Sequence, residues 1–205
     1  MKKTNKLYII ALLMLLMASA AKAQTGFTVG ANISNLYVDD VDDENAKVGL
    51  NIGIYNRIKI TNFLGIQHEF LYAQKGAAVQ YDNFLSGSGT YKYNLNYIKM
   101  PVMLSANLGK LNIHAGPYVG FLAGVKIKDV DGDGSINSIQ ELDRDDFNTV
   151  DYGGVAGLGY DFDGGILGVR YNYGFREIGK SGSFAGEATS EAKNSALTVY
   201  IGFHF

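Results

Sequence analysis

The most distinctive chemical motif in the sequence is a set of oxygen-bearing side chains spaced two residues apart. It comprises Asp129, Asp131, Asp133 and Ser135, with glycines at 132 and 134. Calcium prefers oxygen ligands, and this order matches the first half of an EF-hand-type loop. The complete pattern has a glutamate at its twelfth position, where this chain has Gln140 followed by Glu141, and no flanking helices are predicted. The motif therefore predicts a weak calcium site, with a solvated acidic turn as the alternative.

A second group of reactive side chains comes from four different expected strands. Glu69, Lys99, Asp151 and Arg170 each lie opposite the apolar face of their strand. If the strands close into a barrel, opposite charges in its narrow interior should pair, because an unpaired buried charge is costly. We predict a polar network in the lumen rather than a conduction pathway, since side chains largely fill the interior of an eight-stranded barrel.

Catalytic chemistry has little support in the sequence. His68, His114 and His204 lie on separate expected strands without a motif around them, and no serine has a recognisable nucleophile context. The chain contains no cysteine, which excludes disulfides, cysteine-ligated metals and a lipidated cysteine. We expect no enzyme activity and no cofactor apart from the calcium ion.

The elements that position these residues are predicted by an alternation of apolar and polar side chains, which puts the two kinds on opposite faces of a strand. Phe27, Val29, Ala31 and Ile33 alternate with small or polar residues, for example. The pattern recurs eight times. The expected strands lie around 26–34, 48–55, 63–75, 91–105, 111–125, before 162, at 165–176 and before 205.

The connections between these strands also alternate. Short turns are expected at 59–62, 106–110 and 163–164, and long polar links at 37–46, 76–90, 126–146 and 177–193. Short periplasmic turns and long extracellular loops are typical of bacterial outer-membrane barrels. A secreted soluble barrel of lipocalin type is disfavoured, because each strand carries only about one charged residue and a water-facing surface needs far more.

The N-terminus has the features of a secretory signal peptide. Lys2, Lys3 and Lys6 precede an apolar run at 7–17 that is too short to span a bilayer. Ala21 and Ala23 are small residues at the two positions that a signal peptidase reads. We predict a signal peptide at 1–23 and an outer-membrane β-barrel domain at 24–205. The remaining chain is acidic, so a nucleic-acid partner is not expected.

Five short motifs carry a family resemblance. They are EFLYAQKG at 69–76, YIKMPV at 97–102, GGVAGLGY at 153–160, RYNYG at 170–174 and the closing Phe205. In their order and spacing the chain resembles the PorT-like outer-membrane β-barrel proteins over essentially its whole mature length. The founding member is linked to secretion of surface proteases, so the resemblance implies location, fold and an accessory role in export. Ile201, Phe203 and Phe205 look like the signal that the outer-membrane assembly machinery reads.

The sequence therefore predicts an all-β protein, an eight-stranded antiparallel up-and-down transmembrane β-barrel in the outer membrane of a Gram-negative cell. We expect a structural, interaction or protein-export accessory role without a large pore. A narrow, porin-like solute channel is the alternative, followed by a lipid-modifying enzyme. The expected partners are outer-membrane lipid and lipopolysaccharide, the assembly machinery during biogenesis, and a secretion-system component.

Overall fold

A computed structural model describes residues 23–37, 46–76, 78–83, 87–131, 136–142, 144–180 and 192–205. The strands are β1 (Ala23–Tyr37), β2 (Lys47–Lys59), β3 (Leu64–Lys75), β4 (Ala78–Asn83), β5 (Gly87–Leu108), β6 (Leu111–Asp131), β7 (Ile136–Leu142), β8 (Val150–Phe162), β9 (Gly165–Glu177) and β10 (Lys193–His204). A 3-10 turn, η2 (Arg144–Asp146), precedes β8. No helix within these ranges is long and apolar enough to cross a membrane. The predicted signal peptide lies outside the described residues except for Ala23, which begins β1.

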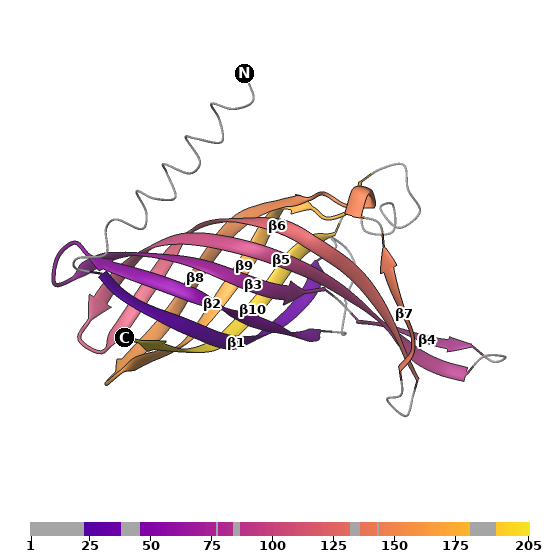
Figure 1. The fold of residues 1–205 in the computed structure, drawn as a ribbon, viewed down its shortest axis with the longest axis horizontal. Helices are drawn as coiled ribbons and strands as arrows, with labels where there is room; N and C mark the ends of the chain where they lie inside the picture. Colours follow the sequence, from indigo (N-terminus) through magenta and orange to yellow (C-terminus); the bar gives the residue numbers. More distant parts are fainter. Residues whose placement is uncertain are drawn as a thin grey trace, which may run out of the picture.

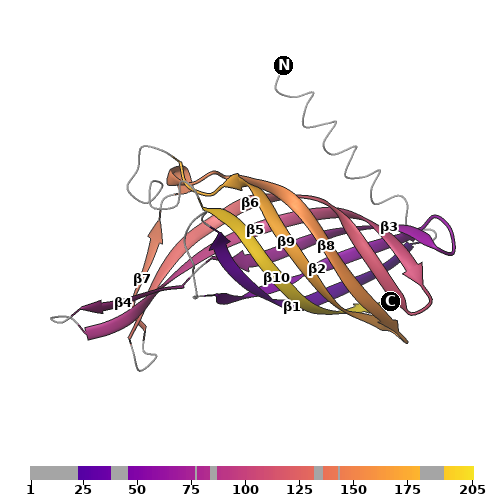
Figure 2. The same cartoon turned by 180° about the vertical axis from the view of Figure 1, so that it is seen from behind.

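Eight strands close into an antiparallel barrel (Figures 1 and 2). Their order around the barrel is β1, β2, β3, β5, β6, β8, β9 and β10. Closure is made by β1 and β10, which pair continuously from Gly26 opposite His204 to Leu36 opposite Asn194. Each strand pairs with the next barrel strand in the chain, so the predicted eight-stranded up-and-down topology is confirmed.

The barrel wall has an apolar outer face and a polar inner face. On β2, Ile52 is 44 % exposed whereas the neighbouring Asn51 is 5 % exposed. The same alternation exposes Phe27 on β1 and buries Thr28 beside it. An apolar exterior over a polar interior is the arrangement that a membrane-spanning barrel requires. The sequence alternation therefore assigned the two faces correctly.

Tight turns join the strands at one end of the barrel. Gly109 (φ 67°) lies in the two-residue turn between β5 and β6, and Gly164 (φ 86°) in the turn between β8 and β9. A positive φ of this kind is easy for glycine and suits the tight turns of β-hairpins. The C-terminus lies at the same end (Figure 1), which we call the short-turn end.

The opposite end, the long-link end, differs from the sequence prediction. The links expected at 76–90 and 126–146 contain β4, β7 and the outer parts of β5 and β6. These strands form a four-stranded extension, β4–β5–β6–β7, that projects from the barrel (Figures 1 and 2). Residues such as Lys126, Ser138 and Gln140 give this sheet no continuous apolar face, so it lacks the alternation that reveals a half-buried strand.

The extension is long because β5 and β6 have 22 and 21 residues. A tilted transmembrane strand needs only about 9–11 residues. Roughly ten residues of each strand therefore lie beyond the bilayer, a reach of about 30 Å at the rise of a β-strand. We call this part of the molecule the projecting sheet.

Candidate functional site

The structure places all four sequence-predicted lumen charges inside the barrel. Glu69 comes from β3, Lys99 from β5, Asp151 from β8 and Arg170 from β9, and each is at most 5 % exposed. Only one pair among the four is a direct ion pair: Arg170 Nη1 lies 2.6 Å from Glu69 Oε2. Lys99 and Asp151 bind other interior groups.

The Glu69–Arg170 pair is surrounded by further polar partners. Arg170 also donates from Nε to His114 Nε2 at 3.0 Å, and its guanidinium carbon lies 3.8 Å from the centre of the Tyr200 ring. The second carboxylate oxygen of Glu69 accepts a hydrogen bond from Gln67. These additional hydrogen bonds help to offset the cost of removing the two charges from water, so that removing either partner alone would leave a costly buried charge.

Asp151 pairs with a lysine that the sequence analysis did not assign to the lumen. Lys75 Nζ lies 3.1 Å from Asp151 Oδ2, and the same oxygen accepts hydrogen bonds from Tyr118 and Asn194, each at 3.1 Å. Lys75 could have been found from the sequence, because it lies on β3 at an even spacing from Glu69 and so shares its face.

Lys99 makes direct contacts with neutral groups. Its Nζ donates to Asn172 Oδ1 at 2.7 Å and lies 5.2 Å from the centre of the Tyr118 ring. The interaction of the ammonium with the ring face adds to the amide hydrogen bond. Lys75 Nζ lies 4.9 Å from the same ring, so Tyr118 lies beside both lysines.

A third ion pair extends the polar interior towards the short-turn end. Arg57 Nη1 lies 2.8 Å from Asp161 Oδ1, and Arg57 Nε donates to Gln67 Oε1 at 3.1 Å. Because Gln67 also binds Glu69, the two ion pairs belong to one hydrogen-bonded network. Asp161 lies close to the expected turn at 163–164. The sequence therefore gave no indication that its side chain pairs with an arginine of the interior.

An apolar cluster lies in the interior towards the long-link end. It contains Leu95, Tyr97, Leu122, Val125, Phe147, Ile178 and Ala192, with Leu142 packed against it. A β-bulge helps to form it: Asn96 pairs with Gly124 but Tyr97 with Leu122, so the extra residue in β6 lets both Leu122 and Val125 be buried. The bulge also marks where the barrel gives way to the projecting sheet.

The calcium motif lies at the hairpin between β6 and β7. Asp129 and Asp131 belong to the end of β6, whereas Asp133 and Ser135 lie outside the described residues. Gln140, at the twelfth position of the motif, pairs with Ile127 within the β6–β7 ladder. Among the described residues no group of three or more metal-binding side chains is found. Calcium binding stays a prediction.

The three histidines do not form a common site. His114 is buried between Arg170 and Asn112, whose Oδ1 lies 2.9 Å from His114 Nδ1. His204 Nδ1 lies 3.4 Å from the Tyr55 hydroxyl near the short-turn end, and His68 is a half-buried residue of β3. His114 therefore contributes to the interior network.

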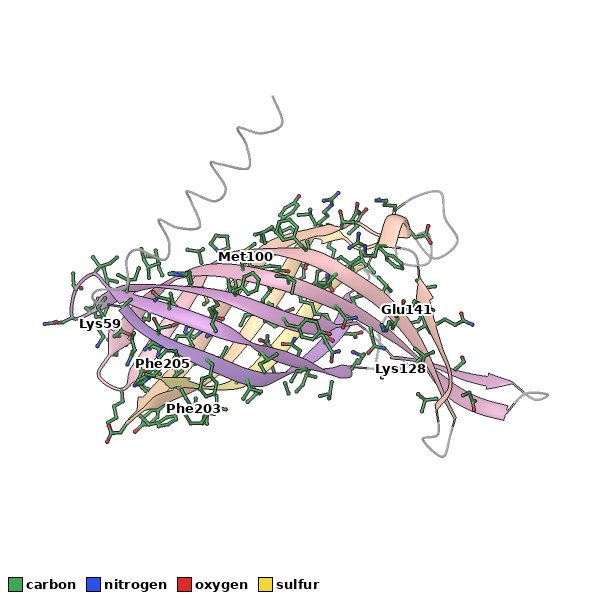
Figure 3. The ribbon with its side chains drawn as sticks, viewed as in Figure 1. Lys59, Met100, Lys128, Glu141, Phe203 and Phe205 are labelled. Atoms are coloured by element: carbon green, nitrogen blue, oxygen red, sulfur yellow. The ribbon has the colours of Figure 1, made fainter. Side chains whose placement is uncertain are left out.

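Of the three residues of the predicted assembly signal, Ile201 and Phe203 belong to β10, and Phe205 follows its end. Phe203 packs on the outer face, with its ring centre 5.5 Å from Phe27 and 6.4 Å from Phe162. Ile201 is half-buried on the same strand, and Phe205 is 85 % exposed (Figure 3). Their recognition by the assembly machinery stays a prediction.

An ion pair on the projecting sheet gives a test of its structure outside the membrane. Lys126 Nζ lies 2.6 Å from Glu141 Oε1, joining β6 to β7. The hydrogen bond and the charge of Lys126 hold the pKa of the Glu141 carboxyl below its usual range, and the same contact raises the pKa of Lys126.

We expect an NMR titration to detect this pair. The Glu141 carboxyl should titrate below an ordinary glutamate, and Lys126→Met should raise its pKa to the usual range. Because the pKa of Glu141 is lowered by folding, the stabilisation is present above the unfolded pKa and is lost as the pH falls through the folded one. An unchanged titration in Lys126→Met would show that β7 does not pair with β6 as described.

Together, the closed barrel, its apolar exterior and its polar interior define an integral membrane β-barrel. The family described as outer membrane protein beta-barrel domain matches residues 17–179, so the chain belongs to this family and is an outer-membrane protein. No curated protein matches the chain.

Solved structures similar to the chain include several small outer-membrane barrels. Ail of Yersinia pestis, solved with the heparin analogue sucrose octasulfate, shares 15 % identity at a TM-score of 0.47, with 90 % of this chain and 99 % of Ail covered. Neisserial surface protein A shares 12 % identity at a TM-score of 0.46, with 90 % and 98 % covered. The N-terminal barrel domain of Pseudomonas aeruginosa OprF shares 12 % identity at a TM-score of 0.36, with 89 % and 99 % covered.

Proposed function

We propose that the protein is an outer-membrane anchor that presents its projecting sheet to an extended segment of another protein. One observation carries this proposal: β4 and β7 are the two ends of the strand order, so within the described ranges each pairs with a neighbour on one side only. A strand edge of this kind offers main-chain donors and acceptors to which a partner strand can add.

The β7 edge is the better candidate for strand addition. Residues 137–141 are all exposed, and among them Ile139 is apolar and 54 % exposed. Short edge strands are usually protected by proline or by several charges, whereas β7 has no proline and only Glu141 as a charged residue. An apolar side chain within an accessible edge supports specific contact with a partner strand.

Site-specific photo-cross-linking in intact cells tests this function. A photoreactive residue in place of Ile139 should give a discrete protein adduct, and one in place of Leu158, which is 55 % exposed on the barrel exterior, should not. With the cross-linker moved to position 141, Ile139→Lys should remove most of the adduct, because a charge on an edge opposes strand addition. Equal yields from positions 139 and 158 would contradict the proposal.

An accessory role in protein export is a specific form of the same function, supported by the PorT resemblance. In that role the partner would be a secretion-system component, while outer-membrane lipid and lipopolysaccharide surround the barrel. Deleting the gene should then cause a selective loss of exported proteins that the native chain restores and Ile139→Lys does not. An unchanged set of exported proteins would leave the anchor role without the export role.

We also expect no large pore. The apolar cluster narrows one end of the lumen, and the Lys75–Asp151 pair and Tyr118 are buried in the barrel interior. Purified protein in planar bilayers should therefore show no stable, large unitary conductance. The double variant Phe147→Ala, Ile178→Ala removes side chains from the cluster but keeps the polar groups of the interior, so it should also show none. Large, stable conductance steps from the native protein would contradict this expectation.

The two alternatives predict different results. Small, reproducible conductance steps would identify a narrow solute channel. A change in lipid A that depends on one of the histidines would identify a lipid-modifying enzyme.

A further inference from the structure

The short-turn end of the barrel contains a polar hollow that the anchor function does not use. Its volume is about 420 Å³, and side chains lining it include Gln24, Arg57, Lys59, Asn62, Asp161 and His204. Figure 3 shows Lys59 and Phe205 at this end, opposite the projecting sheet. Since short turns and termini face the periplasm in bacterial outer-membrane barrels, the hollow opens on the periplasmic side.

Arg57 is the most unusual group in this hollow. It is only 3 % exposed, and two of its three nitrogens are used: Nη1 pairs with Asp161 and Nε donates to Gln67. The third nitrogen, Nη2, is buried without a hydrogen-bond partner in the described part of the chain. A buried donor without an acceptor is costly, so this position favours a ligand that supplies an oxygen atom.

The other lining groups indicate what kind of ligand this is. Guanidinium groups bind carboxylates through strong, charge-assisted hydrogen bonds, and Lys59 adds a second, exposed cation near Arg57. The carboxamides of Gln24, Asn62 and Asn107 match the donors and acceptors of main-chain amides. The volume falls within the range of small-ligand pockets and accommodates a few residues of a peptide.

We propose that this hollow binds the carboxylate end of a peptide, with Arg57 and Lys59 receiving the carboxylate and the carboxamides receiving the adjacent peptide groups. Asp161 and Asp163 also line the hollow. Asp161 is held by Arg57 and by Asn112, whose Nδ2 lies 3.1 Å from Asp161 Oδ2, and it leaves Nη2 free. The two acids keep the affinity modest. The inference does not depend on the projecting sheet or on its partner.

Two sources could supply this chemistry on the periplasmic side: the C-terminus of a protein, and the stem peptide of the cell wall, which ends in D-amino acids. We would titrate the isotope-labelled full barrel in lipid nanodiscs with L-Ala-L-Ala-L-Ala, with L-Ala-D-Ala-D-Ala, and with the C-terminal amide of the L-peptide. The NMR signals to follow are the Arg57 Nε–H and the backbone amides of Gly109 and Gly164, which line the hollow.

We expect saturable shifts with at least one free-acid peptide and about tenfold weaker binding of the amide, the effect of losing one charge-assisted hydrogen bond. Tighter binding of the D-peptide would point to the cell wall, and tighter or equal binding of the L-peptide to a protein terminus. Equal binding of acid and amide, or no saturable shift with either acid, would overturn the proposal.

Variants separate the site from nonspecific attraction of an anion. Arg57→Lys retains the charge but loses the planar donor set, and it should weaken binding by about tenfold. Lys59→Gln changes an exposed residue and should weaken binding without affecting folding. Lys128→Gln removes one positive charge from the projecting sheet and should leave binding unchanged. Equal losses in Lys59→Gln and Lys128→Gln would show general electrostatic attraction and overturn the assignment to the hollow.

Discussion

Replacing Arg170 with glutamine is expected to lower the free energy of unfolding by about 3–5 kcal/mol, the usual cost of removing one partner of a buried ion pair. The variant leaves the Glu69 carboxylate, whose side chain is fully buried, without its cation. It also removes the donor to His114 Nε2 and the contact with the Tyr200 ring. Urea unfolding of the barrel in phospholipid vesicles, followed by fluorescence or gel mobility, measures the change.

Two further variants separate the ion pair from a general effect of losing an arginine. The double variant Glu69→Gln, Arg170→Gln removes both charges, so it should recover much of the loss. Arg176→Gln is the matched control: Arg176 donates to Val150 O and Asn148 Oδ1 at the rim, and its loss should cost about 1 kcal/mol. Equal costs for Arg170→Gln and Arg176→Gln would contradict a central role for the Glu69–Arg170 pair.

The barrel could be predicted from the sequence because two different solvents act on its two faces. Lipid outside and a polar lumen inside impose a strict alternation, as in Val48, Leu50, Ile52 and Ile54 of β2. That alternation identifies the strands, and it also gives the direction of Glu69, Lys99, Asp151 and Arg170. The same reasoning extends to Lys75, which shares a face with Glu69.

The partners inside the barrel could not be predicted in the same way. Glu69 and Arg170 are 101 residues apart and lie on strands that are not neighbours, so their contact across the lumen depends on the stagger of all eight strands. Alternation gives the direction of a side chain but not its height in the barrel. For this reason the sequence did not indicate that Asp151 pairs with Lys75 or that Arg57 pairs with Asp161.

The projecting sheet was missed for a different reason. Beyond the membrane both faces of a sheet meet water, so β7 (INSIQEL) carries polar residues without a regular apolar period. Its strand structure is stabilised by the ladder with β6, in which Lys128 pairs with Ile139. A short polar strand of this kind cannot be distinguished from a loop by composition.

The position of the bilayer on the barrel can be tested with an arginine on the barrel exterior at the middle of a strand. Val199 lies near the middle of β10, faces outward and pairs with Ala31 on one side and Val169 on the other. Val199→Arg should therefore lower the free energy of unfolding in vesicles by about 2–4 kcal/mol, the cost of an arginine at the bilayer midplane.

Depth within the membrane is the variable that the controls must test. Leu108 is the last residue of β5, at the short-turn end, and its side chain is exposed on the barrel exterior. Leu108→Arg should lower the free energy of unfolding by only about 0–1 kcal/mol, because a charge near the membrane interface reaches water. Ile139→Arg on the projecting sheet should leave the stability nearly unchanged, since Ile139 already faces water. The three positions are similarly exposed in the isolated chain, so a clear ranking of Val199 over Leu108 over Ile139 can come only from lipid around the barrel and water around the sheet. Equal costs at Val199 and Ile139 would contradict this placement of the membrane, and with it the division of the molecule into an anchored barrel and a sheet available to partners.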